Sequence, residues 1–213
     1  NLVKNENYWD GNVNVDEIMV RTISDGDTLA LALQSGEINA AYGMAYASYP
    51  VFENDNYQFT SVQTSRSFYV QMNYASPVVA DDAVRGAIAM GIDKESFVNV
   101  LLNGYGYVAT GAFPDTVAFG GSTLNAKTYD PEAAKAVLEE AGWTDSDGDG
   151  IRELDGKNIN LRYISYENRL LNEFSDAHTQ YLTEIGIGVT SEYGSSDDQW
   201  SKLAALDYDF NNN

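Results

Sequence analysis

The chain has no cysteine among its 213 residues and a single histidine, His178. The lack of cysteine excludes disulfides, thiol nucleophiles and thiolate metal ligands, and it is compatible with an exported protein that folds without disulfides. No apolar run approaches the ~20 residues that a helix needs to span a bilayer. The first residues, Asn1 to Lys4, lack the methionine and apolar core of a signal peptide, so a fragment or processed piece is expected.

Basic residues are also scarce, with 12 Lys and Arg against 32 Asp and Glu, for a formal charge of −20. Binding to nucleic acid is excluded on this ground, because phosphate backbones require clusters of Lys and Arg. Anionic membrane surfaces are disfavoured for the same reason. A solvated acidic surface that maintains solubility is the simplest interpretation.

Signals of catalysis are weak. His178 falls on the apolar stripe of a predicted helix, which favours a packed or inter-domain histidine over a ligand or base. No serine lies in a nucleophile-elbow context, and the glycines Gly104 and Gly106 follow a helix and lack the third glycine of a dinucleotide motif. A hydrolase with paired carboxylates stays an alternative, but spacing selects no pair among 32 acids. We therefore expect no enzyme.

The order of predicted elements indicates an α/β protein. A strand at 15–23, a helix at 29–34 that ends at Gly36 and a strand at 38–44 would form a βαβ unit with a partly parallel sheet. Further elements are expected in this order: a strand at 67–73, helices from 81 and from 93, a long loop at 105–128, a helix at 130–142, a strand at 158–166, a helix at 167–185, a strand at 187–193 and a helix at 197–206.

An aspartate-rich loop follows the helix at 130–142. Asp145, Asp147 and Asp149 alternate before Gly150, as in the first half of a calcium loop, and Glu153 occupies the ninth position. The twelfth position is a glycine, where such loops carry a bidentate glutamate. Two alternatives stay open: a structural Ca²⁺ site, or an acidic turn that is held by Asx-type hydrogen bonds without metal. No cofactor is required in either case.

Six motifs follow one another along most of the chain. They are N-E-N-Y-W-D-G at 5–11, S-G-E-I-N at 35–39, Asn73 with D-A-V-R-G-A-I-A-M-G-I-D-K-E at 82–95, Gly104 with Gly106, Y-D-P-E-A-A-K to A-G-W at 129–143, and D-G-D-G-I at 147–151. In this order they resemble the family 5 extracellular solute-binding proteins of peptide and nickel ABC importers. Asn39 and Gly91 depart from the family pattern, in which Asp and Ala are usual.

The resemblance implies part of a periplasmic-binding-protein-like type II fold. Residues 1–66 would belong to lobe I, 67–76 would form a crossover strand, and 77–213 would form a lobe III that is truncated at its C-terminus. The implied function is to capture oligopeptides or dipeptides outside the cytoplasmic membrane and to deliver them to an ABC permease. A nickel or other metal complex is the alternative ligand in the same family. A calcium-dependent extracellular interaction module is the alternative from another class.

The resemblance also implies a cleft and its lining. Tyr42, Gly43 and Met44 from lobe I, Tyr69, Gln71 and Asn73 from the crossover, and Asn103 and Tyr105 from a helix end in lobe III would face the solute. Ordinary packing is the alternative for the tyrosines. Arg85 is expected to be a structural ion-pair partner. The protein would be a monomer outside the cytoplasm, anchored by a lipid through an upstream segment, and this piece alone would bind peptides poorly.

Overall fold

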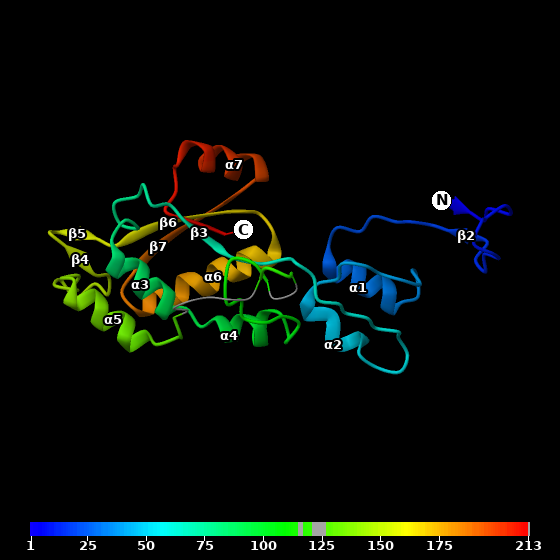
Figure 1. Ribbon diagram of the computed structural model, residues 1–213, viewed down its shortest axis with the longest axis horizontal. Helices are drawn as coiled ribbons and strands as arrows, with labels where there is room; N and C mark the ends of the chain where they lie inside the picture. Colours follow the sequence, from blue (N-terminus) through cyan, green and yellow to red (C-terminus); the bar gives the residue numbers. More distant parts are fainter. Residues whose placement is uncertain (115–116, 121–126, 213) are drawn as a thin grey trace. The chain divides into compact units, whose positions relative to one another are not determined.

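The computed structural model describes residues 1–114, 117–120 and 127–212, and the chain divides into two compact units, Asn1–Phe59 and Thr60–Asn213 (Figure 1). The predicted long loop at 105–128 contains the segments 115–116 and 121–126, which lie outside the described residues. Among the described residues, no helix is long and apolar enough to cross a membrane. The assignment of the two units to lobes stays a prediction.

The first unit contains two short strands and three short helical segments. β1 (Leu2–Val3) pairs antiparallel with β2 (Glu17–Ile18), and α1 (Gly26–Gln34), the 3₁₀ turn η1 (Tyr46–Ser48) and α2 (Tyr49–Phe52) follow. Asp25 caps α1 by accepting from the N–H of Thr28. The small core of the first unit contains Leu29, Ala30, Ala32 and Phe52.

The predicted βαβ arrangement of the first unit is wrong. The strand expected at 15–23 is reduced to Glu17–Ile18, because β1 is its only partner and offers just two residues for pairing. Residues 38–44 form no strand, since no neighbouring segment pairs with them and Gly43 has a φ of +75°, outside the extended region. Apolar composition alone does not make a strand when the backbone groups lack a partner.

The second unit is built on a four-stranded sheet in the order β3-β8-β6-β7. β6 (Asn160–Tyr166) is parallel to both β7 (Gly188–Gly194) and β8 (Phe210–Asn212), and β3 (Val70–Met72) is antiparallel to β8. The predicted α/β class is thus confirmed for this unit. The strand expected at 67–73 is shorter than predicted, because only Val70–Met72 pair with β8. The sequence did not predict β8 itself.

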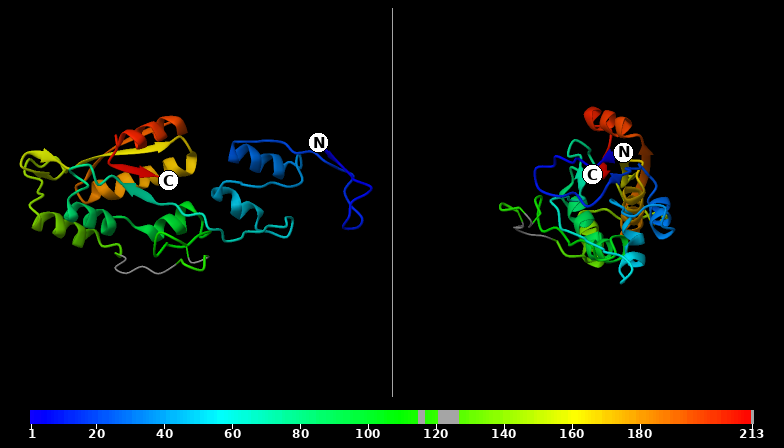
Figure 2. Two further views of the ribbon diagram at one scale, coloured as in Figure 1. Left: turned by 45° about the horizontal axis from the view of Figure 1, so that its top comes forward. Right: turned by 90° about the vertical axis from the view of Figure 1, so that its right-hand side faces the viewer.

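Two helices cover opposite faces of this sheet (Figures 1 and 2). α6 (Arg169–Glu184) connects β6 to β7, and α7 (Ser196–Ala205) connects β7 to β8. Asn211 bonds to Gln199 of α7, whereas the next residue, Asn212, bonds to the Leu171 carbonyl of α6. Successive side chains of a strand point to opposite faces, so these contacts place α6 and α7 on the two sides of β8.

The main core lies on the α6 face. α3 (Asp82–Gly91) and α5 (Pro131–Glu140) pack there with α6, and α4 (Lys94–Ser96) continues into the π-helical turn η2 (Phe97–Leu101). The hairpin of β4 (Glu153–Leu154) and β5 (Lys157–Asn158) follows the aspartate loop. The core contains Val79, Val84, Ala87, Ile88, Ile92, Ala134, Leu138, Trp143, Ile159, Leu161, Tyr163, Leu182, Ile185, Ile187 and Phe210. The predicted helices of this unit are confirmed with small shifts at their ends, except that the helix expected from 93 has only three α-helical residues before the π-helical turn.

Side-chain caps explain where these helices begin. Asp81, Asp130 and Asn168 each accept a backbone N–H from the first turn of α3, α5 and α6. α7 begins with a capping box, in which Ser195 and Asp198 bond reciprocally. After α5, Gly142 has a φ of +90°, a conformation that glycine adopts without strain.

Candidate functional site

The carboxyl ends of the parallel strands define one edge of the sheet in the second unit. β6, β7 and β8 end there at Tyr166, Gly194 and Asn212, and α6 and α7 begin just after the first two. Ligands of open α/β sheets bind outside this kind of edge. β3 begins at the same edge, because its first residue, Val70, is paired with Asn212, the last residue of β8.

The three predicted crossover residues are spread along β3 from this edge to the opposite one. Tyr69 precedes the strand and is half exposed, and Gln71 is exposed in the middle of the strand. Asn73 lies beyond its far end and is buried; its Nδ2 donates to the carbonyls of Leu206 (3.1 Å) and Tyr208 (2.7 Å), and its Oδ1 accepts from Ala75 N. Asn73 therefore holds the loop before β8. A solute contact through any of the three stays a prediction.

Asn103 and Tyr105 follow the π-helical turn. Asn103 is exposed with a φ of +49°, and Gly104 has a φ of +79°. The N–H of Gly104 donates to Val98 O over 2.8 Å, which closes the turn. π-helical turns and left-handed residues occur often at functional sites, so the geometry is compatible with the predicted role of this segment.

Tyr42, Gly43 and Met44 belong to the first unit. They lie in irregular backbone between α1 and η1; Tyr42 is fully exposed and Met44 is half-buried. The eight predicted cleft residues are thus divided between the two units. Their grouping around one solute stays a prediction.

His178 is packed in the core, as its position on the apolar stripe predicted. The hydroxyl of Tyr163 lies 2.8 Å from His178 Nδ1, and the rings of Phe97 and His178 are 4.7 Å apart. Burial, together with the nearby charge of Lys94, lowers the pKa of His178 to about 3. Burial also raises the pKa of the Tyr163 phenol, so the hydroxyl stays protonated and shares a hydrogen bond with the neutral imidazole. This histidine therefore has a structural role in the core.

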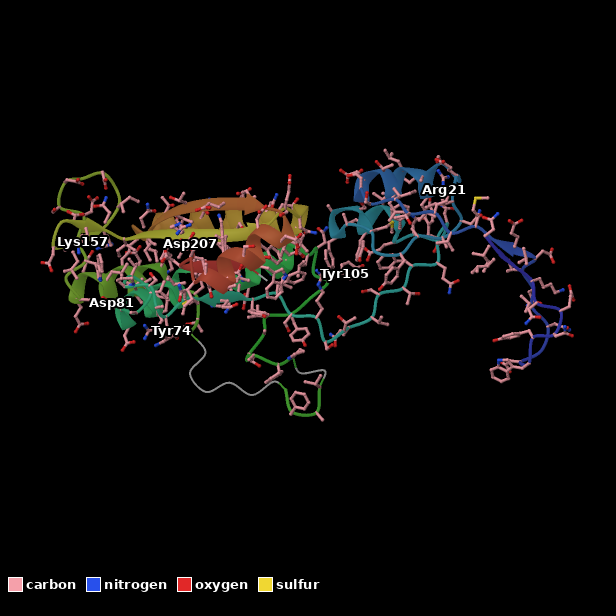
Figure 3. All side chains as sticks on the ribbon, turned by 90° about the horizontal axis from the view of Figure 1, so that it is seen from above. Arg21, Tyr74, Asp81, Tyr105, Lys157 and Asp207 are labelled. Carbon is pink, nitrogen blue, oxygen red and sulfur yellow. The ribbon has the colours of Figure 1, made fainter. Side chains whose placement is uncertain are left out.

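Arg85 and Arg162 are both structural. Arg85 pairs with Asp82 and donates to the carbonyls of Val79 and Ala80, which confirms its predicted ion pair near the helix start. Arg162 pairs with Asp207 and Glu192. Asp207 is labelled in Figure 3. Hydrogen bonds from the Arg162 guanidinium to Asp207 hold the pKa of that carboxyl below its usual range.

A hollow of about 240 Å³ lies beside this ion pair. It is lined by Asn73, Ala75, Ser76, Pro77, Arg162, Leu206, Asp207, Tyr208 and Asp209. Arg162 lies near the amino end of β6, so the hollow is at the sheet edge opposite to the carboxyl ends. The ion pairs already occupy the arginine, which leaves the hollow without a free cationic group.

The aspartate loop brings three of its four predicted ligands together. One carboxylate oxygen each of Asp145, Asp147 and Asp149 lies within 4.8 Å of the others, and all three residues are exposed. Each also accepts a backbone N–H inside the loop; Asp145, for example, accepts from Gly148 and Gly150. Oε1 of Glu153 accepts from Ser146 N over 2.8 Å, whereas its Oε2 is buried and has no partner within the described part of the chain.

Sequence reasoning missed an amide network beside β8. Nε2 of Gln199 donates to Asn211 Oδ1 (2.7 Å) and to the carbonyl of Asn212 (3.0 Å), and Asn212 Nδ2 donates to Leu171 O (3.0 Å). All three amide side chains are buried. The only signal in the sequence is the run of asparagines after Phe210, which is more typical of a turn than of a buried strand.

Comparison with known proteins identifies the family. The family model of bacterial extracellular solute-binding proteins, family 5 Middle, matches residues 1–212. The chain belongs to this family. The nickel-binding periplasmic protein of Escherichia coli K12 is 32% identical over 196 residues, which cover 89% of this chain and 37% of that protein. The oligopeptide-binding protein AppA of Bacillus subtilis is 27% identical over 208 residues, or 95% of this chain and 37% of AppA.

Solved structures agree with this assignment. NikA from Brucella suis, in complex with Fe(III)-EDTA, superimposes with a TM-score of 0.89 at 25% identity, covering 99% of this chain and 44% of NikA. AppA from B. subtilis, in complex with a nonapeptide, gives a TM-score of 0.75 at 25% identity and covers 90% and 39%. The predicted family and its partial α/β fold are confirmed. The chain spans less than half the length of these relatives.

Proposed function

We propose that this chain is part of the solute-binding component of an ABC importer, which captures oligopeptides or dipeptides outside the cytoplasmic membrane and delivers them to a permease. The match of the family over residues 1–212 carries the proposal. Tyr69, an exposed aromatic residue beside the carboxyl ends of the strands, supports it, because a solute clamp needs hydrogen-bonding groups and aromatic walls rather than a catalytic base. The whole protein would act as a monomer, attached to the membrane by a lipid.

A role in catalysis has little support. The chain's single histidine is buried and neutral, with Nδ1 occupied by the Tyr163 hydroxyl. The relatives named above are binding proteins. We therefore propose that the protein binds its solute without chemical change.

Nickel or another metal complex is the second candidate ligand, since one relative is a nickel-binding protein by name and the NikA structure contains Fe(III)-EDTA. Within the described residues, His178 is too buried to reach a metal without unfolding the core around it. Where it contacts this chain, a bound complex would therefore rely on its own chelator and on oxygen groups. Peptide is favoured for this reason.

Calorimetric titration of the whole protein separates these ligands. Penta-alanine, nickel chloride and the nickel complex of histidine are titrated separately, and we expect heat only from penta-alanine. Heat from a nickel species with none from the peptide would overturn the peptide assignment. The 213-residue chain alone serves as a control, and we expect it to bind penta-alanine much more weakly, because it covers under half the length of its relatives.

We also propose that the aspartate loop holds a structural Ca²⁺ ion, with Asp145, Asp147, Asp149 and Glu153 as ligands. The support is the convergence of three carboxylates together with the buried, unpartnered Oε2 of Glu153, since an unpaired carboxylate oxygen is costly without a cation. The alternative of a calcium-dependent interaction module would need the same ion.

Calcium titration tests this proposal. We expect binding at millimolar Ca²⁺ that is lost in Asp147→Asn and kept in the control Asp155→Asn, a nearby residue outside the cluster. No heat at millimolar Ca²⁺ would remove both the ion and the interaction module. Chelation by EGTA should leave the protein folded, because every aspartate of the cluster already accepts a backbone N–H.

A further inference from the structure

One buried amide in the second unit lacks a hydrogen bond. Asn211 of β8 is fully buried, and its Nδ2 has no partner anywhere in the described ranges 1–114, 117–120 and 127–212. Buried N–H groups are rarely left unpaired in folded proteins, because desolvation of the donor is costly when no acceptor replaces water. The unpaired group therefore requires an explanation.

The orientation of this amide is fixed by its neighbour. Nε2 of Gln199 donates to Asn211 Oδ1 over 2.7 Å and to the backbone carbonyl of Asn212 over 3.0 Å. A backbone carbonyl can only accept, so Gln199 must turn its NH₂ group toward β8. Asn211 must then meet Gln199 with its oxygen, and its NH₂ group points elsewhere.

The two cross-strand neighbours of Asn211 differ in what they offer. Asn211 is paired in register with Gln71 of β3 and with Ile164 of β6, and opposite residues have their side chains on the same face. Ile164 has no acceptor. Gln71 is exposed, and its carboxamide has no partner among the described residues. Opposite Cβ atoms lie about 4.5–5.5 Å apart, so the two amides can meet.

We propose that Asn211 orients Gln71 for solute binding. Nδ2 of Asn211 donates to Gln71 Oε1, which turns the NH₂ group of Gln71 outward to donate to an acceptor oxygen of the solute, a carbonyl or carboxylate of a peptide. Gln199, Asn211 and Gln71 then form one directed chain of amides from α7 across β8 to β3. This inference rests on the proposed function, and in it Gln71 contacts the solute while Asn211 is a positioning residue.

The direction of the chain has a chemical consequence. In this chain the NH₂ group of each amide donates to the oxygen of the next. The oxygen of Gln71 is therefore turned toward Asn211, and its NH₂ group faces the solute as a donor. Asn211→Asp replaces the donor by an acceptor, which would reverse Gln71 and present its oxygen outward. The affinity of Asn211→Asp for a solute with carbonyl and carboxylate groups should therefore fall as much as that of a variant in which the Gln71 amide is removed.

The test is a double-mutant cycle in the whole protein with penta-alanine as the probe. Gln71→Met should weaken binding about tenfold, which is the loss of roughly one hydrogen bond. Asn211→Leu should weaken it to a similar extent, and the double variant should be no weaker than Gln71→Met alone. A purely structural effect of Asn211 would instead add to that of Gln71, so additivity overturns the inference.

Two controls complete the cycle. Gln180→Met removes an exposed amide from α6 and should leave the affinity unchanged. Gln71 is exposed, so Gln71→Met should keep the melting temperature of the wild type, and unchanged affinity in this folded variant overturns the inference alone. If wild-type protein fails to bind penta-alanine, the peptide function proposed above fails and this inference fails with it.

Discussion

The indole N–H of Trp143 donates to Asp81 Oδ2 over 3.1 Å. Asp81 is also the N-cap of α3, where its Oδ1 accepts from Ala83 N. Trp143 ends the Ala-Gly-Trp segment that follows α5, so one carboxylate connects the end of α5 to the start of α3. The last residue of one family motif thus contacts the residue just before another, and this hydrogen bond joins two core helices.

Removing this bond should destabilise the second unit. Trp143→Phe keeps an aromatic ring in a site that is only 7% exposed but removes the donor to a charged acceptor. We expect a loss of about 2 kcal/mol in the free energy of unfolding, as measured by urea denaturation. Trp200→Phe, at an exposed position of α7, is the matched control and should change stability by less than about 0.5 kcal/mol. Equal losses in the two variants would contradict the role of the bond.

Local signals explain why the second unit was predictable. Each long helix has a side-chain cap and an apolar stripe, and β6 and β7, which flank α6, contain β-branched and aromatic residues. β8 was not predictable, because two of its three residues are asparagines whose burial depends on Gln199 and Leu171 far along the chain. The prediction for the first unit failed for the opposite reason: its apolar segments look like strands, but among the described residues only Glu17–Ile18 of these segments are paired.

His178 should make stability depend on pH. Its folded pKa of about 3 lies below the ordinary value of 6.5, so the unfolded chain takes up a proton that the folded chain does not. The contribution is therefore fully present above about pH 6.5 and is lost as the pH falls toward 3, at up to about 1.4 kcal/mol per pH unit. His178→Gln, which keeps an acceptor for Tyr163, should show a shallower decline in urea unfolding between about pH 6 and pH 4.

The carboxylates titrate in the wild type and in the variant alike, so the difference between the two curves isolates the histidine. Parallel curves over this range would contradict a buried, neutral His178. A steeper decline of stability with falling pH in the variant than in the wild type would also contradict a buried, neutral His178.

The candidate site was only partly predictable. The resemblance predicted that Tyr69, Gln71 and Asn73, in and beside β3, line the cleft. Tyr69 and Gln71 are exposed, whereas Asn73 is buried. The structure shows that Asn73 holds residues 206 and 208, a contact between positions more than 130 apart in the sequence. Such long-range bonds leave no periodic signal. The aspartate loop, by contrast, was predictable because all its contacts are local.

Two glycines with a similar backbone conformation should respond differently to a methyl group. Gly148 and Gly186 have φ values of +81° and +87°, so alanine strains the backbone at both, by about 1 kcal/mol. A Cβ at Gly148 would meet nothing within 4 Å, whereas one at Gly186 would lie 2.8 Å from Cγ of Arg152. We expect Gly186→Ala to cost at least about 1 kcal/mol more than Gly148→Ala in urea unfolding.

The reason is that Arg152 cannot easily move aside. Its guanidinium donates to the carbonyls of Ile185 and Trp143 and pairs with Glu139, and its side chain is mostly buried. Equal costs for the two alanine variants would mean that Arg152 shifts without losing these bonds.

Salt should stabilise this protein against heat. With 32 acidic and 12 basic residues, at least 20 acids are left without a basic partner of their own, and the folded state brings their charges closer together. Screening shortens the reach of this repulsion from about 10 Å at 0.1 M salt to about 3 Å at 1 M. We therefore expect the melting temperature to rise steadily with sodium chloride at pH 7, and to rise less near pH 4, where the carboxylates are partly protonated. A melting temperature that falls with salt at pH 7 would show that the described ion pairs, such as Arg162 with Asp207 and Glu192, outweigh the repulsion among the excess acids.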